Sequence, residues 1–228
     1  HENEIAQWEG ATGESFVNLW MHNGFVRIND EKMSKSLSNF FTVREVLERY
    51  QPEVVRYFIL TSHYRSPLNY SDQELDSAKH ALTRFYTALR GLPVTTEPCP
   101  DDSYKQRLEA AMNDDFNTPE VLAILFDLSH EINRIRSDEP ARAAQLGGEL
   151  RRLGQIIGLL QNDPDAYLQG QDTKAGLSAA EIEQLIADRK AARTHKDWAK
   201  ADQIRTQLTE QGIVLEDNAQ GTTWRREV

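Results

Sequence analysis

The chain has 228 residues, 39% of them hydrophobic, so it can bury a sizeable core and hold one to three domains. Its formal net charge is −10. On composition alone, this negative charge argues against a nucleic-acid-binding protein. No apolar run approaches the roughly 20 residues of a membrane span, and no signal-peptide pattern is present. The single cysteine, Cys99, excludes an internal disulfide and indicates a reducing, cytoplasmic setting.

The charge is distributed unevenly along the sequence. Residues 91–180 carry 15 acidic and 8 basic side chains, a net of −7, whereas the window 189–205 carries six basic and two acidic ones. The basic side chains of that window are Arg189, Lys190, Arg193, Lys196, Lys200 and Arg205. Such a run is most often the solvated face of a helix. It indicates a nucleic-acid partner only when other features of the sequence do so as well.

Residues 1–69 combine β-prone and helical patterns. Residues 16–29 are rich in aromatic and β-branched side chains, which predicts strands or a hairpin. Thr42 and Glu45 have the spacing of a capping box that opens a helix. Pro52 then separates that helix from a second one, which its apolar composition predicts to be buried.

Residues 70–161 predict an antiparallel helical bundle. Ser71 and Glu74 repeat the capping-box spacing, Gly91 ends that helix, and Pro119 stands at the start of another. Three apolar stripes recur at helical spacing: Leu75, Ala78, Leu82, Phe85 and Leu89; Val121, Leu125, Leu128, Ile132 and Ile135; Leu146, Leu150, Leu153, Ile157 and Leu160.

A polar, glycine-containing linker is predicted over residues 162–177, followed by a small module over residues 178–228. In the module we expect one helix from the Ser178 capping box to about Thr194 and another from about Lys196 to Gln211. Two short strands follow. A module of about 50 residues has a marginal core by itself, so we expect it to rest on its neighbours.

The segment Lys32-Met33-Ser34-Lys35-Ser36 places two ammonium groups and two hydroxyls in a polar loop before a helix. Lysine is a flexible, strongly hydrated point charge that suits a polyphosphate, and serine hydroxyls can donate to the same oxygens. Nucleotidyl transfer needs positive groups where charge develops in the transition state. On composition alone, a lysine-rich surface loop remains the commoner interpretation.

This pentapeptide resembles the K-M-S-K-S signature of class I aminoacyl-tRNA synthetases. The resemblance implies a loop that closes a Rossmann-type catalytic domain over ATP and magnesium, with Met33, Ser34 and Ser36 in the ATP site. It implies that Lys35 stabilises the pyrophosphate during adenylate formation and that Lys32 assists. Because several synthetases carry the signature, it does not identify the amino acid.

Longer segments narrow the resemblance to cysteinyl-tRNA synthetases. They are H-E-N-E-I-A-Q at 1–7, H-Y-R-S-P-L-N-Y-S at 63–71, D-D-F-N-T-P at 114–119 and E-D-N-A-Q-G-T-T-W-R-R at 216–226. The chain resembles the C-terminal half of that family. The resemblance implies a ligase that activates cysteine with ATP and transfers it to the 3′ end of its tRNA. It implies a mainly α fold: the end of a Rossmann-type domain, a helical bundle on the anticodon-stem side and a small α+β C-terminal module that binds the anticodon.

The resemblance also implies a zinc ion in the amino-acid pocket, held by two cysteines, a histidine and a glutamate. Glu4 matches the glutamate, and the other three ligands would lie upstream of His1. Zinc prefers a thiolate to a hydroxyl, which separates cysteine from the nearly isosteric serine. Without the resemblance, Glu4 is a solvated carboxylate at a helix start. Since the H-I-G-H signature would also lie upstream, we expect this stretch alone to be inactive in aminoacylation.

Anticodon bases are single-stranded, and proteins recognise them by stacking and by hydrogen bonds to base edges. The resemblance makes Arg193, Trp198, Asp202 and Asp217 the expected anticodon contacts. The helical spacing of Trp198 leaves a core position equally open. Trp224 is predicted to anchor the core of the C-terminal strands.

Two alternatives remain. One is the mycothiol-pathway cysteine ligase, which uses the same loop but needs no anticodon module, so residues 178–228 favour the synthetase. The other is a tRNA-binding module without catalysis. The family resemblance further implies a monomer that binds cysteine, ATP and cysteine tRNA, with no membrane partner.

Overall fold

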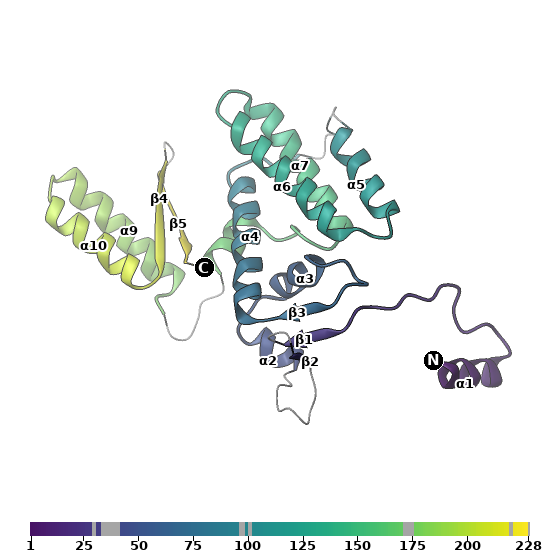
Figure 1. Cartoon of the computed structure of the whole chain (residues 1–228). Helices are drawn as coiled ribbons and strands as arrows, with labels where there is room; N and C mark the ends of the chain where they lie inside the picture. Colours follow the sequence, from purple (N-terminus) through teal and green to yellow (C-terminus); the bar gives the residue numbers. More distant parts are fainter. Residues whose placement is uncertain are drawn as a thin grey trace.

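The computed structural model describes residues 1–28, 31–32, 42–95, 99, 102–170, 176–218 and 221–227. This part of the chain is mainly helical (Figure 1). Its elements are α1 (Glu2–Thr12), β1 (Val26–Ile28), β2 (Glu31–Lys32), α2 (Val43–Leu47), α3 (Pro52–Leu60), β3 (Leu68–Tyr70), α4 (Asp72–Leu89), α5 (Ser103–Asn113), α6 (Thr118–Ile135), α7 (Pro140–Ile156), α8 (Pro164–Gln169), α9 (Ala179–Thr194), α10 (Trp198–Glu210), β4 (Ile213–Asn218) and β5 (Gly221–Arg226).

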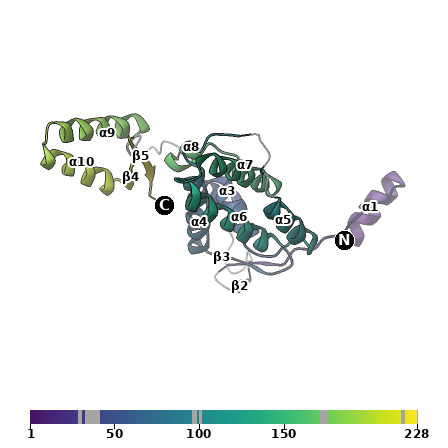
Figure 2. The same ribbon diagram turned by 90° about the horizontal axis from the view of Figure 1, so that it is seen from above.

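The elements are arranged as a central body with two projections. Helices α3 to α8 form the body, and α9, α10, β4 and β5 extend from one side of it. Helix α1 lies at the opposite side, at the end of an extended segment, as both views show (Figure 2). No helix among the described residues is long and apolar enough to cross a membrane.

The strand prediction for residues 16–29 is confirmed only for β1. Residues 16–25 form no strand, and Trp20 and Phe25 there are exposed. A strand needs a continuous row of backbone hydrogen bonds to a partner. Gly24 and Phe25 make one such bond each, whereas β1 pairs along its length, antiparallel with β2 and parallel with β3. The sheet order is therefore β2-β1-β3.

The predicted helix starts are confirmed by their caps. Thr42 Oγ1 accepts the Glu45 N–H at 3.3 Å, and the Glu45 carboxylate accepts the Thr42 N–H at 2.6 Å, which completes the capping box of α2. Ser178 and Glu181 form the same pair of bonds at α9, while Ser71 Oγ accepts a backbone N–H at the start of α4. Each bond satisfies a backbone N–H that the helix cannot.

The predicted bundle is confirmed as well. Helices α4, α6 and α7 bury their apolar stripes in one core, where Leu75, Leu82 and Phe85 are fully buried. The third stripe continues beyond its helix, because α7 ends at Ile156 while Leu160 stays buried in a left-handed turn.

The predicted linker over 162–177 contains a helix, so that part of the prediction is wrong. Asp163 caps α8 by accepting the Ala166 N–H at 2.9 Å, and Pro164 occupies its first turn. Tyr167 and Leu168 are buried against the bundle core. These two side chains are enough to dock α8 on the bundle. A helix of six residues is too short to show a helical period in the sequence.

The C-terminal module has a second core. Ile182 and Ile186 from α9, Leu208 from α10 and Trp224 from β5 pack together, and none of them belongs to the bundle core. Trp224 is 1% exposed, so its predicted anchoring role is confirmed. Trp198 is 60% exposed, so the core interpretation of that residue is wrong.

Candidate functional site

The three-stranded sheet includes Lys32, the first residue of the segment 32–36, which we call the lysine loop. Lys32 is the last residue of β2 and pairs with Arg27 of the central strand β1. Residues Met33 to Ser36 lie outside the described residues, so the roles expected of Lys35 and its neighbours stay predictions. The loop therefore starts from a strand whose position depends on β1.

The segment that precedes β1 is held by the loop between α3 and β3. The Gly24 N–H donates to the Tyr64 carbonyl at 2.7 Å, and the Leu68 N–H donates to the Phe25 carbonyl at 3.0 Å. A Cβ atom on Gly24 would lie 2.1 Å from the Ser66 carbonyl oxygen. Only glycine allows the two backbones to approach this closely.

The same loop is bound to the turn between α5 and α6. Arg65 Nε donates to Asp115 Oδ2 at 2.7 Å, and the Tyr64 hydroxyl donates to Asp115 Oδ1 at 2.7 Å. These bonds, from Arg65 first and Tyr64 second, lower the pKa of Asp115. Asp115 and Phe116 both adopt left-handed backbone conformations, with φ of 53° and 57°. Two segments that carry the family resemblance, 63–71 and 114–119, thus meet in space.

Glu4 stands on α1 with an exposed side chain. Its Oε1 lies 4.0 Å from His1 Nδ1, and the His1 ring stacks on Trp20 and His22 with centroids 5.3 and 5.6 Å apart. Among the described residues, no three histidine, cysteine, aspartate or glutamate side chains gather as metal ligands. Cys99 is buried apart from this segment, in the bundle core. Glu4 can therefore supply one oxygen ligand, and it belongs to no three-ligand group within the described residues.

Asp217 on β4 is bound by arginines of α9. Arg189 Nη1 and Nη2 donate to its two carboxylate oxygens at 3.2 and 3.1 Å, and Arg193 Nη1 lies 3.6 Å from Oδ2. The Arg189 bonds, with one from Thr222, lower the pKa of Asp217 to about 2. The structure thus brings two of the four expected anticodon residues together.

Arg189 is buried, although the basic window 189–205 suggested the solvated face of a helix. It is 8% exposed and belongs to the inner face of α9, not to a solvated face. The signal was present in the sequence, since Arg189 follows Ile182 and Ile186 at helical spacing. A buried charge needs a partner, and Asp217 provides it.

The other two expected contacts lie on α10. Trp198 begins the helix, and Asp202 follows one turn later with an exposed side chain on the same face. The turn before Trp198 passes through Lys196 with a left-handed φ of 61°. An exposed indole beside a carboxylate can stack on a base and accept a hydrogen bond from a base edge.

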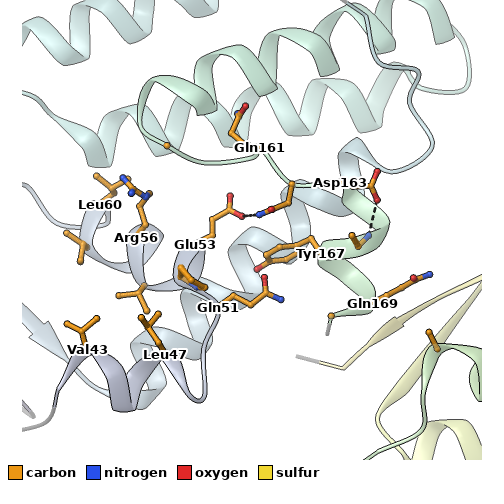
Figure 3. Close-up of a pocket in the computed structure, with 18 residues that line it drawn as sticks. Val43, Leu47, Gln51, Glu53, Arg56, Leu60, Gln161, Asp163, Tyr167 and Gln169 are labelled. Carbon is orange, nitrogen blue, oxygen red and sulfur yellow. Dashed lines mark hydrogen bonds between the residues drawn. The ribbon is translucent and has the colours of Figure 1, made fainter. Parts of the chain in front are cut away.

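A large open pocket lies elsewhere, between α2, α3 and α8 (Figure 3). It has a volume of about 1000 Å³, and Val43, Leu47, Arg56 and Gln169 are among its lining residues. None of the expected site residues lines it. No motif in the sequence indicated this pocket.

Three protein-family models match successive stretches of the chain. The model for the tRNA synthetases class I (C) catalytic domain matches residues 1–80, and the DALR domain matches residues 107–161. The model for the cysteinyl-tRNA ligase anticodon binding domain matches residues 176–225.

Curated relatives named cysteine–tRNA ligase match over the whole chain. The relative from Methylococcus capsulatus is 63% identical and covers 100% of this chain. Those from Thioalkalivibrio sulfidiphilus and Laribacter hongkongensis are 62% and 58% identical and each cover 99% of it. The chain belongs to the cysteinyl-tRNA synthetase family. It spans about half the length of the curated relatives it matches, 50% of the first and 49% of the other two.

The regions matched to the cysteinyl-tRNA synthetase family correspond to the structural parts. Tyr64 and Arg65 lie in the catalytic-domain match and Asp115 in the DALR match, so the contact described above joins two family regions. The module of α9, α10, β4 and β5 lies in the anticodon-binding match. A solved chain titled as the ternary complex of Agrobacterium radiobacter K84 LeuRS, tRNA and LeuAMS is a more distant likeness, at TM-score 0.44 and 20% identity, covering 68% of this chain and 23% of that one.

Proposed function

We propose that the whole protein ligates cysteine to its tRNA, by activating cysteine with ATP and magnesium as an adenylate and then transferring it to the tRNA 3′ end. The observation that carries this proposal is the succession of three family matches, from a class I catalytic domain to a cysteinyl anticodon-binding domain. Within it, residues 1–69 are the end of a Rossmann-type catalytic domain with a stem-contact region, 70–161 the bundle beside the anticodon stem and 178–228 the anticodon-binding module. Residues 162–177 connect the last two parts and include α8, which packs on the bundle core.

In this proposal, the loop that begins at Lys32 closes over ATP. Lys35 stabilises the charge that develops on the pyrophosphate, and Lys32 assists from the end of β2. A series of contacts supports this. Asp115 binds the 63–66 loop, that loop hydrogen-bonds the residues just before β1, and β1 pairs with β2. Met33, Ser34 and Ser36 complete the ATP contacts.

Glu4 supplies one ligand to a zinc ion, together with ligands outside residues 1–228. Its exposed side chain supports this role, because Asp and Glu oxygens are among the ligands of zinc. When bound, zinc would select a thiolate over a hydroxyl.

The anticodon contacts are Arg193, Trp198, Asp202 and Asp217. The exposed indole of Trp198 offers a stacking surface, and the half-exposed guanidinium of Arg193 offers a second. Asp217 has a further role within the module through Arg189. We also propose a cytoplasmic monomer, by analogy with the family.

The catalytic part is tested with the full-length protein by cysteine-dependent ATP–pyrophosphate exchange. Lys35→Ala is expected to lower exchange by at least 100-fold while cysteine binding changes little. Equal losses in both would make the lysine structural. Exchange no higher than background in the wild type would contradict the ligase and favour a tRNA-binding protein without catalysis. The mycothiol-pathway alternative is disfavoured by the match of residues 176–225 to an anticodon-binding domain.

A further inference from the structure

The C-terminal module and the bundle share no apolar core. The bundle core ends at Leu168, and the module core starts at Ile182. The orientation of the module therefore depends on the contacts at the junction, where α8 packs on β5. Hydrogen bonds and ion pairs connect the two parts at this junction, and one side chain takes part in several of them.

That side chain is Arg90, the residue that follows α4. Its side chain is only 10% exposed. Nη1 donates to Glu216 Oε2 on β4 at 3.3 Å, and Nη2 donates to the Trp224 carbonyl on β5 at 2.9 Å. Nε lies 2.8 Å from Asp165 Oδ1 on α8, which makes an ion pair without the angle of a hydrogen bond. One guanidinium thus joins the bundle, α8 and both strands of the module.

The position of Arg90 is itself fixed. Arg136, at the end of α6, donates to the carbonyls of Arg90 and Ala88, which holds the last turn of α4. Gly91 follows with a left-handed φ of 73°, so the chain turns away directly after Arg90. Glu216 is fixed from the other side, by Arg225 Nε at 3.0 Å.

Small rotations at this junction have large effects at the far end of the module. Helix α9 has 16 residues and is therefore about 24 Å long. A rotation of about 10° at its base would move the turn before Trp198 by roughly 4 Å, given that length. A hydrogen bond to a base edge tolerates a change of only a few tenths of an ångström in the donor–acceptor distance.

We propose that Arg90 is a positioning residue for tRNA recognition: its forked contacts to Asp165, Glu216 and the Trp224 carbonyl set the orientation of the C-terminal module. A planar guanidinium can make these contacts together, and the single ammonium group of lysine cannot. The consequence for tRNA rests on the proposed function, whereas the orientation itself does not.

The functional test uses the full-length enzyme with Arg90→Gln, Arg90→Lys and the control Arg107→Gln. Arg107 also binds a carboxylate, Asp127 Oδ2 at 2.7 Å, but on the exposed surface of the bundle. For Arg90→Gln we expect kcat/KM for cysteine tRNA to fall about tenfold or more, while ATP–pyrophosphate exchange stays within about twofold of wild type. The control should change neither, and Arg90→Lys should fall between.

The structural test is independent of activity. Spin labels at Gln106→Cys on α5 and Gln207→Cys on α10, in the 228-residue chain with Cys99→Ser, report the distance between bundle and module. Arg90→Gln should broaden or shift that distance distribution, and Arg107→Gln should not. An unchanged distribution would overturn the proposal, as would full tRNA activity of Arg90→Lys or equal losses of exchange and aminoacylation in Arg90→Gln. A wild type that fails to charge tRNA would contradict the proposed function alone, because the distance measurement would still test the orientation.

Discussion

Arg189 on α9 binds Asp217 on β4 through both terminal nitrogens, at 3.2 and 3.1 Å. This pair links the helical half of the C-terminal module to its hairpin, beside the apolar core that contains Ile186. The same carboxylate lies 3.6 Å from Nη1 of Arg193, whose side chain is half exposed. Asp217 therefore has a structural role that its expected place among the anticodon contacts does not reveal.

Replacing Asp217 by asparagine should destabilise the module by about 1 kcal/mol at pH 7, a figure reduced from the full pKa shift because the side chain is half exposed. The folded pKa of about 2 lies below the ordinary 3.8, so this stability is present above about pH 4 and is lost as the pH falls toward 2. Urea unfolding at pH 7 and pH 3 measures it. The exposed Asp202→Asn serves as control, and an equal loss in both variants would argue against the ion pair.

The two tryptophans of the module should respond in opposite ways. Trp198→Ala should change stability by less than about 0.5 kcal/mol, because the side chain is 60% exposed, but weaken tRNA binding by about 1–3 kcal/mol if a base stacks on it. Trp224→Ala should cost about 3–5 kcal/mol of stability, since the indole is buried and its Nε1 donates to Glu183 at 2.6 Å. Thermal unfolding and filter binding separate the two. A large stability loss in Trp198→Ala would contradict its assignment.

Two stacked tyrosines beside the pocket provide a matched pair. The Tyr86 hydroxyl donates to Glu53 at 2.7 Å, whereas the Tyr167 hydroxyl is buried without a partner in the described part of the chain. Tyr86→Phe should therefore cost about 1–2 kcal/mol, and Tyr167→Phe should be neutral or stabilising. Burial raises the pKa of both phenols, so neither should ionise below pH 10. Equal losses measured by urea unfolding would contradict the bonding pattern.

Gly24→Ala tests the connection to the lysine loop. The added Cβ would lie 2.1 Å from a backbone oxygen, so residues 24–28 must shift and move β2 with them. We expect ATP–pyrophosphate exchange by the full-length protein to fall at least tenfold. Gly10→Ala is the control, because nothing lies within 4 Å of its added Cβ and alanine favours the helix. Unchanged exchange in Gly24→Ala would mean that β1 does not position the loop.

Local features were predictable from the sequence. The capping boxes at Thr42 and Ser178, the end of α4 before Gly91 and the buried stripes of the bundle follow from rules that act over a few residues. The succession of bundle and C-terminal module was predictable for the same reason.

Contacts between distant residues were not predictable. Arg90 and Glu216 are 126 positions apart, and Tyr64 and Asp115 are 51 apart, so no local pattern links them. Residues 16–25 failed as strands because strand formation depends on a partner as well as on side-chain type. Helix α8 is too short to show a period, and its docking depends on the core beneath Tyr167.

The most direct test of the central claim, that this chain carries the anticodon-reading part of a cysteine–tRNA ligase, is an affinity measurement. The 228-residue chain would be titrated at low salt with cysteine tRNA and with the same tRNA carrying an exchanged anticodon. We predict at least tenfold tighter binding of the native anticodon, and loss of that preference in Trp198→Ala. Equal affinity of the wild-type chain for both tRNAs would contradict the claim.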